Sequence, residues 1–239
     1  MSGGVLVLWD VDHTLVDAAG LGHRAFQAAF RQVFGRDFGY VPPMAGRTDR
    51  AIAIDLLIGN GVPEPDGYLE EFRAAAEKAL AELEGLLRTE GRALPGAAAA
   101  LTALAETAAV QTLLTGNIRA FAAAKMRAFG LSEHLDLDIG AYGWAHPVRA
   151  HLVDLARSAA RARHGRAFGG RATVLVGDTP RDVEAALATG ASVVAVATGS
   201  YTTTELRAAG AHRVLASLAD TQAVLAAIAE VAVAPTDHT

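Results

Sequence analysis

The chain has 239 residues, 51% of them hydrophobic, and a formal net charge of −5. This length and apolar content suit one large α/β domain, or a core with a small insertion, and exclude general disorder. The absence of cysteine excludes disulfides and thiolate metal sites, and it is compatible with a reducing cytoplasm. No basic block or signal peptide is present, so neither nucleic acid nor export is expected. The longest charge-free stretch, residues 185–204, is broken by glycines and threonines, so no membrane span is predicted.

The first predicted element is a strand over residues 5–9, followed by Asp10 and Asp12. Its apolar, β-branched composition indicates a strand that is buried on both faces. Side chains two residues apart on extended chain point the same way, so both acids should face one pocket where parallel sheets bind ligands. Two such carboxylates repel unless a cation separates them or one is protonated. A divalent cation with oxygen ligands would relieve this repulsion, and one carboxylate could then act as a nucleophile and the other as an acid/base. The alternative is a turn with solvated acids.

Residues 17–90 show helical patterns and no predicted strand. Helices are expected over residues 21–35, from Thr48 or Asp49 to about residue 59, and over residues 68–91. This pattern predicts a separate helical unit inserted after the first strand.

From residue 94 onward the predicted elements alternate between helix and strand, which indicates a parallel sheet. The tail, residues 234–239, is predicted to be disordered. In chain order, the helices are expected over residues 95–108, 118–129, 146–164, 181–189, 204–209 and 218–231, and the strands over residues 110–114, 173–176, 193–197 and 213–215.

Three strand ends carry polar motifs: Asp10-x-Asp12-x-Thr14, then Thr115, then Gly177-Asp178 with an acid four residues later. Their residue types and order resemble the haloacid dehalogenase (HAD) superfamily of phosphohydrolases. The last third of the chain looks like the phosphoglycolate-phosphatase-like branch. The resemblance implies an α/β fold with a Rossmann-like parallel sheet flanked by helices over residues 1–16 and 91–233, and an all-helical cap over residues 17–90.

The resemblance also implies roles for the residues of the first two motifs. Asp10 would attack phosphorus and form an aspartyl-phosphate, and Asp12 would be the general acid and base. Dehalogenases of the superfamily lack the second acid, so Asp12 favours a phosphatase. Thr115, with the backbone amides of Gly116 and Asn117 at a helix start, would bind the phosphoryl group.

The resemblance implies a Mg²⁺ ion held by Asp10, Asp178 and the carbonyl group of Asp12. Asp182 could bind the metal through water, orient a basic residue, or simply be an acid at a helix start.

The superfamily pattern also expects a lysine, occasionally an arginine, between the second and last motifs. No lysine follows Lys125, so Arg149 is the predicted active-site cation, unless it is a surface residue. Lys125 is the rival candidate for this cation, although in mid-helix the stem of a lysine often covers apolar surface.

Other candidates are less defined. Arg47 and Thr48 match a cap loop that often meets substrate in this branch; Thr48 could also cap a helix, and both roles could hold. His13 replaces the commoner glycine; it could contact substrate or cap, or be a partly buried structural histidine.

The predicted function is therefore a Mg²⁺-dependent phosphatase that hydrolyses small phosphate monoesters through an aspartyl-phosphate. A phosphomutase on the same scaffold and a non-catalytic binding protein are the alternatives. Phosphonate hydrolysis would need a cap lysine, and Lys78, in a charged helix, is a poor candidate. The expected partner is a small phosphorylated metabolite, and the expected form is a cytoplasmic monomer or homodimer.

Overall fold

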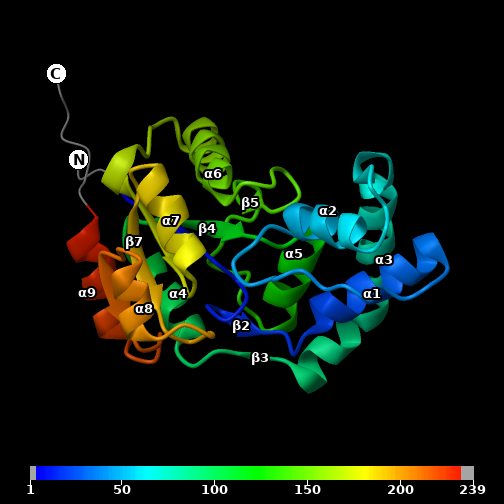
Figure 1. Ribbon diagram of the computed structural model, residues 1–239. Coiled ribbons are helices and arrows are strands. Elements are labelled where there is room, and N and C mark those ends of the chain that lie inside the picture. The colour runs from blue at the N-terminus through cyan, green and yellow to red at the C-terminus, as the bar shows by residue number, and fades with distance from the viewer. Residues whose placement is uncertain (1–3, 233–239) are drawn as a thin grey trace.

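A six-stranded parallel sheet forms the centre of the part of the chain that the computed structural model describes, residues 4–232 (Figure 1). Its strand order is β5-β4-β1-β6-β7-β8, so the first strand lies in the middle and the later strands extend on both sides. The strands are β1 (Leu6–Trp9), β4 (Val110–Thr115), β5 (Ala141–Tyr142), β6 (Thr173–Gly177), β7 (Ser192–Val196) and β8 (Arg213–Leu215).

Alternate residues of β1 pack into two different helical layers, as the two-residue period of a strand requires. Val7 and Trp9 face one layer, whose helices include α4 (Ala97–Ala105) and α9 (Thr221–Val231). Leu6 and Leu8 face the other layer, formed by α6 (Arg149–His164), α7 (Pro180–Ala188) and α8 (Thr203–Ala208). This arrangement confirms the predicted Rossmann-like parallel sheet flanked by helices.

The helical unit between the first and second parallel strands is also confirmed (Figure 1). The chain leaves the core through β2 (Val16–Asp17) and returns through β3 (Arg92–Ala93), and these two strands pair antiparallel. Between them lie α1 (Leu21–Phe34), α2 (Asp49–Gly59), the 3-10 turn η1 (Pro65–Tyr68) and α3 (Leu69–Glu90).

One helix of the core joins the two parts of the molecule. Ala122 and Met126 of α5 (Arg119–Ala128) pack into the sheet's apolar cluster, while Phe121 packs into the cluster of the helical unit. Phe26 and Phe72 belong to that second cluster. Their rings pack edge to face, with the ring centroids 5.2 Å apart. The helical unit therefore has an apolar core of its own that continues onto α5.

Differences from the sequence predictions occur mainly at short elements and helix starts. The two-residue strands β2, β3 and β5 and the 3-10 turns η1 and η2 (Gly170–Ala172) were not predicted, because such short elements show no periodicity. Helix α6 begins at Arg149 rather than residue 146 because Val148 is extended. Helix α9 begins three residues later than predicted, where the Asp220 side chain caps it. The predicted disorder of residues 234–239 lies outside the described residues.

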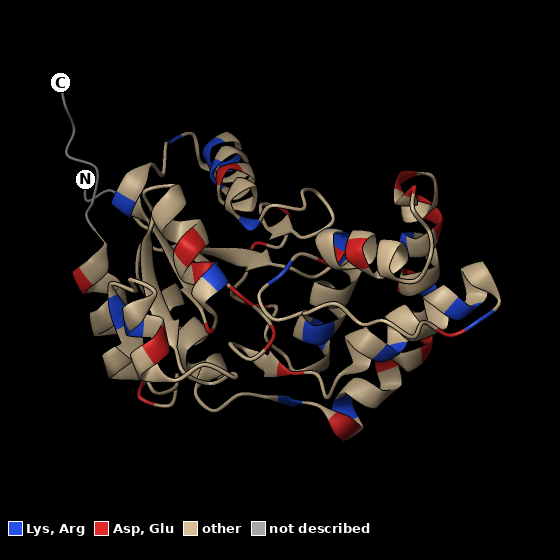
Figure 2. Ribbon diagram, viewed as in Figure 1, with Lys and Arg blue, Asp and Glu red and all other residues tan. Residues whose placement is uncertain are grey.

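None of the helices in residues 4–232 combines the length and the apolar character that a membrane span requires. Charged residues of both signs are spread over the core and the helical unit (Figure 2).

Replacing Phe72 with alanine tests the separate core of the helical unit. Phe72 is fully buried, so Phe72→Ala should lower the free energy of unfolding by about 3–5 kcal/mol. Phe72→Leu keeps most of the volume and should cost less than about 1.5 kcal/mol. Urea unfolding followed by circular dichroism measures both. A loss below about 1 kcal/mol for the alanine variant would contradict the observed packing.

Candidate active site

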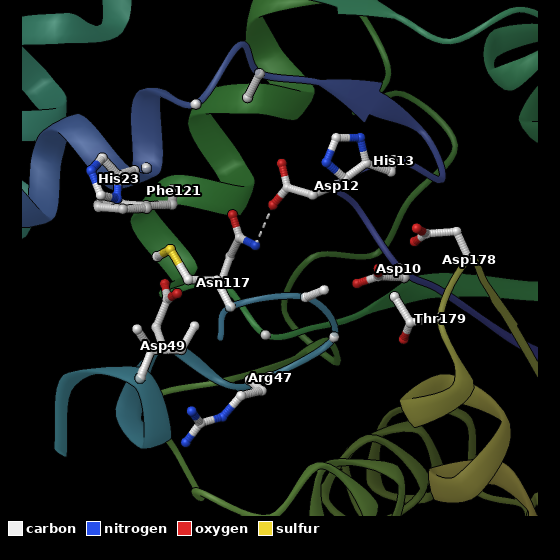
Figure 3. A pocket seen from close by; sticks show the side chains of 18 of the residues that line it. Asp10, Asp12, His13, His23, Arg47, Asp49, Asn117, Phe121, Asp178 and Thr179 are labelled. Carbon is white, nitrogen blue, oxygen red and sulfur yellow. Dashed lines mark hydrogen bonds between the residues drawn. The ribbon is translucent and has the colours of Figure 1, made fainter. Parts of the chain in front are cut away.

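A cavity of about 280 Å³ lies where β1, β4 and β6 end, between the core and the helical unit (Figure 3). Asp10 follows β1 directly, and its backbone N–H donates to the carbonyl group of Val176 at 2.8 Å. The carboxyl ends of parallel strands share one edge, so residues from distant motifs meet there. Asp10, Asp12 and Asp178 all line this cavity, as the sequence predicted.

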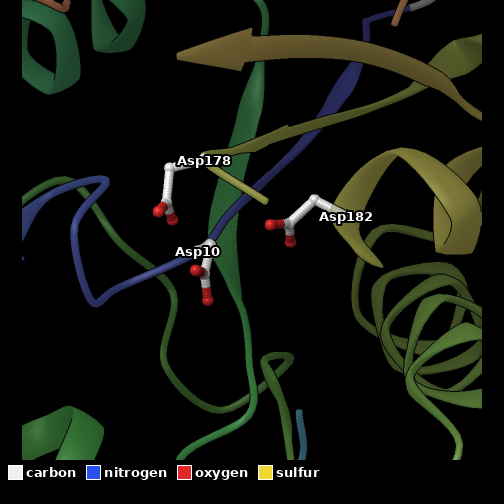
Figure 4. A group of neighbouring side chains, drawn as sticks. All are labelled: Asp10, Asp178 and Asp182. Carbon is white, nitrogen blue, oxygen red and sulfur yellow. The ribbon is translucent and has the colours of Figure 1, made fainter. Parts of the chain in front are cut away.

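Three carboxylates form a buried cluster beneath the cavity (Figure 4). Oxygen atoms of Asp10, Asp178 and Asp182 lie within 4.8 Å of one another. Burial, reinforced by Asp10 and Asp182, raises the pKa of Asp178 to about 9. Burial also raises the pKa of Asp10 to about 6, although Arg149 acts in the opposite direction. Without a cation, the cluster therefore keeps a proton on Asp178 at neutral pH, because its protein partners do not neutralise three ionised carboxylates.

Arg149 is the positive charge within this cluster. Its Nη2 atom lies 2.8 Å from Asp10 Oδ1 and 2.6 Å from Asp182 Oδ1. Burial lowers the pKa of the guanidinium, but Asp182 and Asp10 outweigh this effect, so its pKa lies above the ordinary value. The alternative of a surface arginine is wrong, because Arg149 is only 7% exposed.

A divalent cation fits the charge and the chemistry of this cluster. Three carboxylates against one guanidinium leave two negative charges unbalanced, and all available ligand atoms are oxygens, which suit Mg²⁺. The side chain of Asp12 lies outside the cluster. This agrees with the sequence prediction, which assigned only the carbonyl group of Asp12 to the metal. Asp182 also belongs to the N-terminal cap of α7, where its Oδ2 accepts hydrogen bonds from the backbone and hydroxyl of Thr179.

Asp12 is paired with a different cation. Lys125 Nζ lies 2.7 Å from both carboxylate oxygens of Asp12. Asn117 Nδ2 donates to Asp12 Oδ2 at 2.7 Å (Figure 3). Burial alone would raise the pKa of Asp12, but Lys125 and Asn117 outweigh it, so the pKa lies below its ordinary value. Lys125 thus does more than cover apolar surface with its stem, and both candidate cations, Arg149 and Lys125, lie at the site. Lys125 is two helical turns beyond Asn117, and helical side chains lean toward the N-terminus, so both reach Asp12.

The predicted phosphoryl-binding residues lie in two layers. Gly116 and Asn117 line the cavity, but Thr115 is fully buried and is not among the lining residues of the described chain. Thr115 Oγ1 accepts hydrogen bonds from the backbone and the side chain of Asn117, at 3.2 and 3.1 Å. Thr115 thus holds the backbone and side chain of Asn117 in position. A Cβ atom at Gly116 would lie 2.0 Å from the carbonyl oxygen of Arg47, so only glycine lets the helical unit approach this closely.

The loop before α2 is placed differently from the prediction. Arg47 lines the cavity, but its guanidinium points away from Asp10 and pairs with Asp55 at 2.6 Å (Figure 3). Thr48 caps α2, with its Oγ1 accepting from Ala51 N at 3.3 Å, and donates to the carbonyl group of Pro147. The helix-capping alternative for Thr48 is therefore confirmed.

Two further residues of the cavity wall bear on its chemistry. His13 is exposed and lines the cavity, so the alternative of a partly buried structural histidine is wrong. Asp49, the first residue of α2, also lines the cavity and was not identified from the sequence, where it had only been considered as a helix cap.

Comparison with known proteins supports the class that this geometry indicates. Residues 7–187 match the family of haloacid dehalogenase-like hydrolases, so the chain belongs to that family. "Probable phosphatase IndB" of Dickeya dadantii (strain 3937) is 28% identical over 212 residues, which cover 85% of this chain and 86% of IndB. The family match and this relative bear out the predicted enzyme class, a phosphoric monoester hydrolase.

Solved structures share the fold. The crystal structure of CbbY from Rhodobacter sphaeroides in complex with phosphate is 23% identical, with a TM-score of 0.69 over 92% of this chain and 96% of that one. A "predicted phosphoglycolate phosphatase" from Haemophilus somnus 129pt is 16% identical, with a TM-score of 0.66 over 94% and 99%. At these identities the likeness establishes the fold alone.

The acid cluster predicts how stability changes with pH in metal-free protein. The folded-state pKa values, about 9 for Asp178 and about 6 for Asp10, lie above the ordinary value of 3.8. The folded protein then binds more protons than the unfolded chain, so stability should fall as pH rises from about 4 to about 9. Asp178→Asn should flatten the upper part of this decline, above about pH 7, where Asp10 is already ionised.

Urea midpoints measured in excess chelator across this pH range provide the test. Stability that rises between about pH 7 and pH 9 would contradict the observed charge balance.

Proposed function

We propose that this chain is a Mg²⁺-dependent phosphatase that hydrolyses small phosphate monoesters through an aspartyl-phosphate on Asp10. The observation that carries the proposal is the division of charge around the cavity. Asp10 contacts Arg149 beside a metal-compatible acid cluster, while Asp12 is held separately by Lys125. Two carboxylates in such different environments suit two different chemical tasks. The name of IndB and the phosphate bound to CbbY agree with a phosphate-ester substrate.

In the first step, a carboxylate oxygen of Asp10 bonds to phosphorus as the bond between phosphorus and the ester oxygen breaks. Asp12 gives a proton to the departing alkoxide. Lys125 favours the carboxylate form of Asp12 in the free site, so the negative charge of the bound phosphate must offset Lys125 before Asp12 carries that proton. In the second step, Asp12 takes a proton from water as the water attacks phosphorus and frees Asp10.

The remaining site residues bind and position. Asp10 and Asp178 would hold Mg²⁺ together with the carbonyl group of Asp12, while Asp182 orients Arg149. The bound ion would neutralise charge on the phosphoryl oxygens. Arg149 supplies a fixed positive charge that cannot be lost by deprotonation.

The second motif and the cap complete the proposal. Gly116 and Asn117 would face the phosphoryl group, with Thr115 positioning Asn117. Residues 17–90 would act as the cap that shields the aspartyl-phosphate from bulk water. Arg47 would contribute mainly by ordering the loop before α2. A cytoplasmic monomer or homodimer stays a prediction from the sequence.

A substrate screen with a matched variant tests the proposed function. Purified protein with Mg²⁺ should hydrolyse members of a panel of phosphorylated metabolites, and chelator should abolish this turnover until Mg²⁺ is restored. Asp10→Asn should reduce kcat by several orders of magnitude with little change in melting temperature, because it removes the attacking charge and keeps the shape. Turnover near the wild-type rate in Asp10→Asn would remove Asp10 from the role of nucleophile.

The two cations can be separated by substitution. Arg149→Ala should lower kcat by about 10²–10³-fold, the scale for one preorganised electrostatic partner, and Arg149→Lys should recover part of the loss. Lys125→Met keeps the apolar stem but releases Asp12, so it should lower kcat and shift its pH profile. Arg161→Ala, at an exposed position on α6, is the matched control.

Steady-state kinetics at saturating Mg²⁺, with melting temperatures, distinguish these effects from loss of fold. Unchanged kcat and pH profile in a folded Lys125→Met variant would show that the contact with Asp12 has no catalytic role.

A further inference from the structure

The cavity has two chemically different ends. The charged end contains Asp10, Asp12 and Asp178 with Arg149 and Lys125. The far wall is largely apolar and comes mostly from the helical unit (Figure 3). Its apolar residues are Leu21, Phe26, Met44, Ile52 and Phe121. A substrate with its phosphate at the charged end would therefore place its alcohol part against this far wall.

Asp49 is an acid that this far wall presents to the cavity; Asp17 also lines the cavity, but it pairs with Arg92 at 2.7 Å. Its backbone N–H donates to the carbonyl group of Gly116 at 2.7 Å, and its Oδ2 accepts from Ile118 N at 2.7 Å. The first bond holds the backbone of Asp49 and the second holds its carboxylate. Within residues 4–232, Asp49 Oδ1 takes part in no hydrogen bond or ion pair, and the carboxylate points into the cavity on the side of Phe121 and His23 (Figure 3). Asp49 is half-buried, and burial raises the pKa of its carboxyl group to about 7.

The cations around the cavity already have carboxylate partners. Arg149 contacts Asp10 and Asp182, and Lys125 contacts Asp12. Arg47, the arginine that the loop before α2 contributes to the lining, pairs with Asp55. In the described part of the chain, no lysine or arginine that lines the cavity is left without a carboxylate partner to balance a second anion beside Asp49.

We propose that Asp49 selects the leaving group of the substrate. The preferred phosphate monoesters carry an alcohol part without negative charge, with an amino or hydroxyl group that donates to Asp49 and an apolar portion against Phe26 and Phe121. This inference rests on the proposed phosphatase function and specifies its substrate class.

The same geometry disfavours two substrate classes that the fold alone would allow. A leaving group long enough to reach the far wall would bring a terminal carboxylate next to the Asp49 carboxylate, and like charges repel there. A second phosphate, as in the bisphosphate intermediate of a phosphomutase, would meet the same acid. A donor group instead satisfies the free oxygen of Asp49, and hydrogen bonds to a charged group are the stronger kind.

A series of alkyl phosphates provides the test. The chains have two to five carbons and end in an amino, hydroxyl, methyl or carboxylate group. At about pH 8, above the pKa of about 7 of Asp49, the wild-type protein should show kcat/KM about 10–100-fold higher for the amino or hydroxyl ester than for the carboxylate ester at the best-fitting length. Asp49→Asn keeps the acceptor for Ile118 N but loses the charge, so this ratio should narrow by about tenfold or more. Asp66→Asn, an exposed acid of η1, is the matched control and should leave the ratio unchanged.

The outcomes separate the two proposals. Failure of every ester, including p-nitrophenyl phosphate, would count against the phosphatase function, and calorimetric binding of the same esters to wild-type protein would then test the selectivity directly. Equal or better use or binding of the carboxylate esters at every length would overturn the role of Asp49. The same ratio in wild type and a folded Asp49→Asn variant would overturn it as well. If Asp49→Asn does not fold, the wild-type series alone decides.

Discussion

Repulsion among three buried carboxylates is the constraint on which the rest of the site depends. Asp10, Asp178 and Asp182 are each at most 5% exposed, and their oxygens lie within 4.8 Å of one another. Such a cluster is costly unless positive charge offsets it. Arg149 supplies one such charge, and a divalent cation would balance the two that remain. This charge balance explains why Arg149, the first residue of α6, is buried beside the acids. It also explains why the cluster suits a metal.

Asp12 is separated from this cluster although it lies only two residues from Asp10. Lys125 and Asn117 hold its carboxylate on the α5 side of the cavity. Burial raises the pKa of Asp10 although Arg149 lowers it, whereas Lys125 and Asn117 outweigh burial and hold the pKa of Asp12 below its ordinary value. This difference is a prerequisite for using one as a nucleophile and the other for proton transfer.

Contact between the helical unit and the core is made through backbone as much as through side chains. The carbonyl group of Gly116 accepts from Asp49 N, and a side chain at position 116 would collide with the loop before α2. Asp49, the first residue of α2, thus binds the core through its backbone and also lines the cavity. Docking of the helical unit and the shape of the substrate pocket are therefore coupled, so a change in one alters the other.

The sequence by itself determined the parallel sheet, the inserted helices and the meeting of Asp10 with Asp178. Buried strands have an unmistakable apolar pattern, and the carboxyl ends of parallel strands must share one edge. Arg149 could be proposed from its position between motifs, but its partners could not be predicted. Only the tertiary structure decided that Lys125 contacts Asp12 and that Arg47 is directed toward Asp55 rather than the cavity centre. Local periodicity says which face of a helix is apolar, but not which distant charge a long side chain reaches. The position of Asp49 in the cavity likewise follows from how the helical unit docks on Gly116, a contact between residues far apart in the chain.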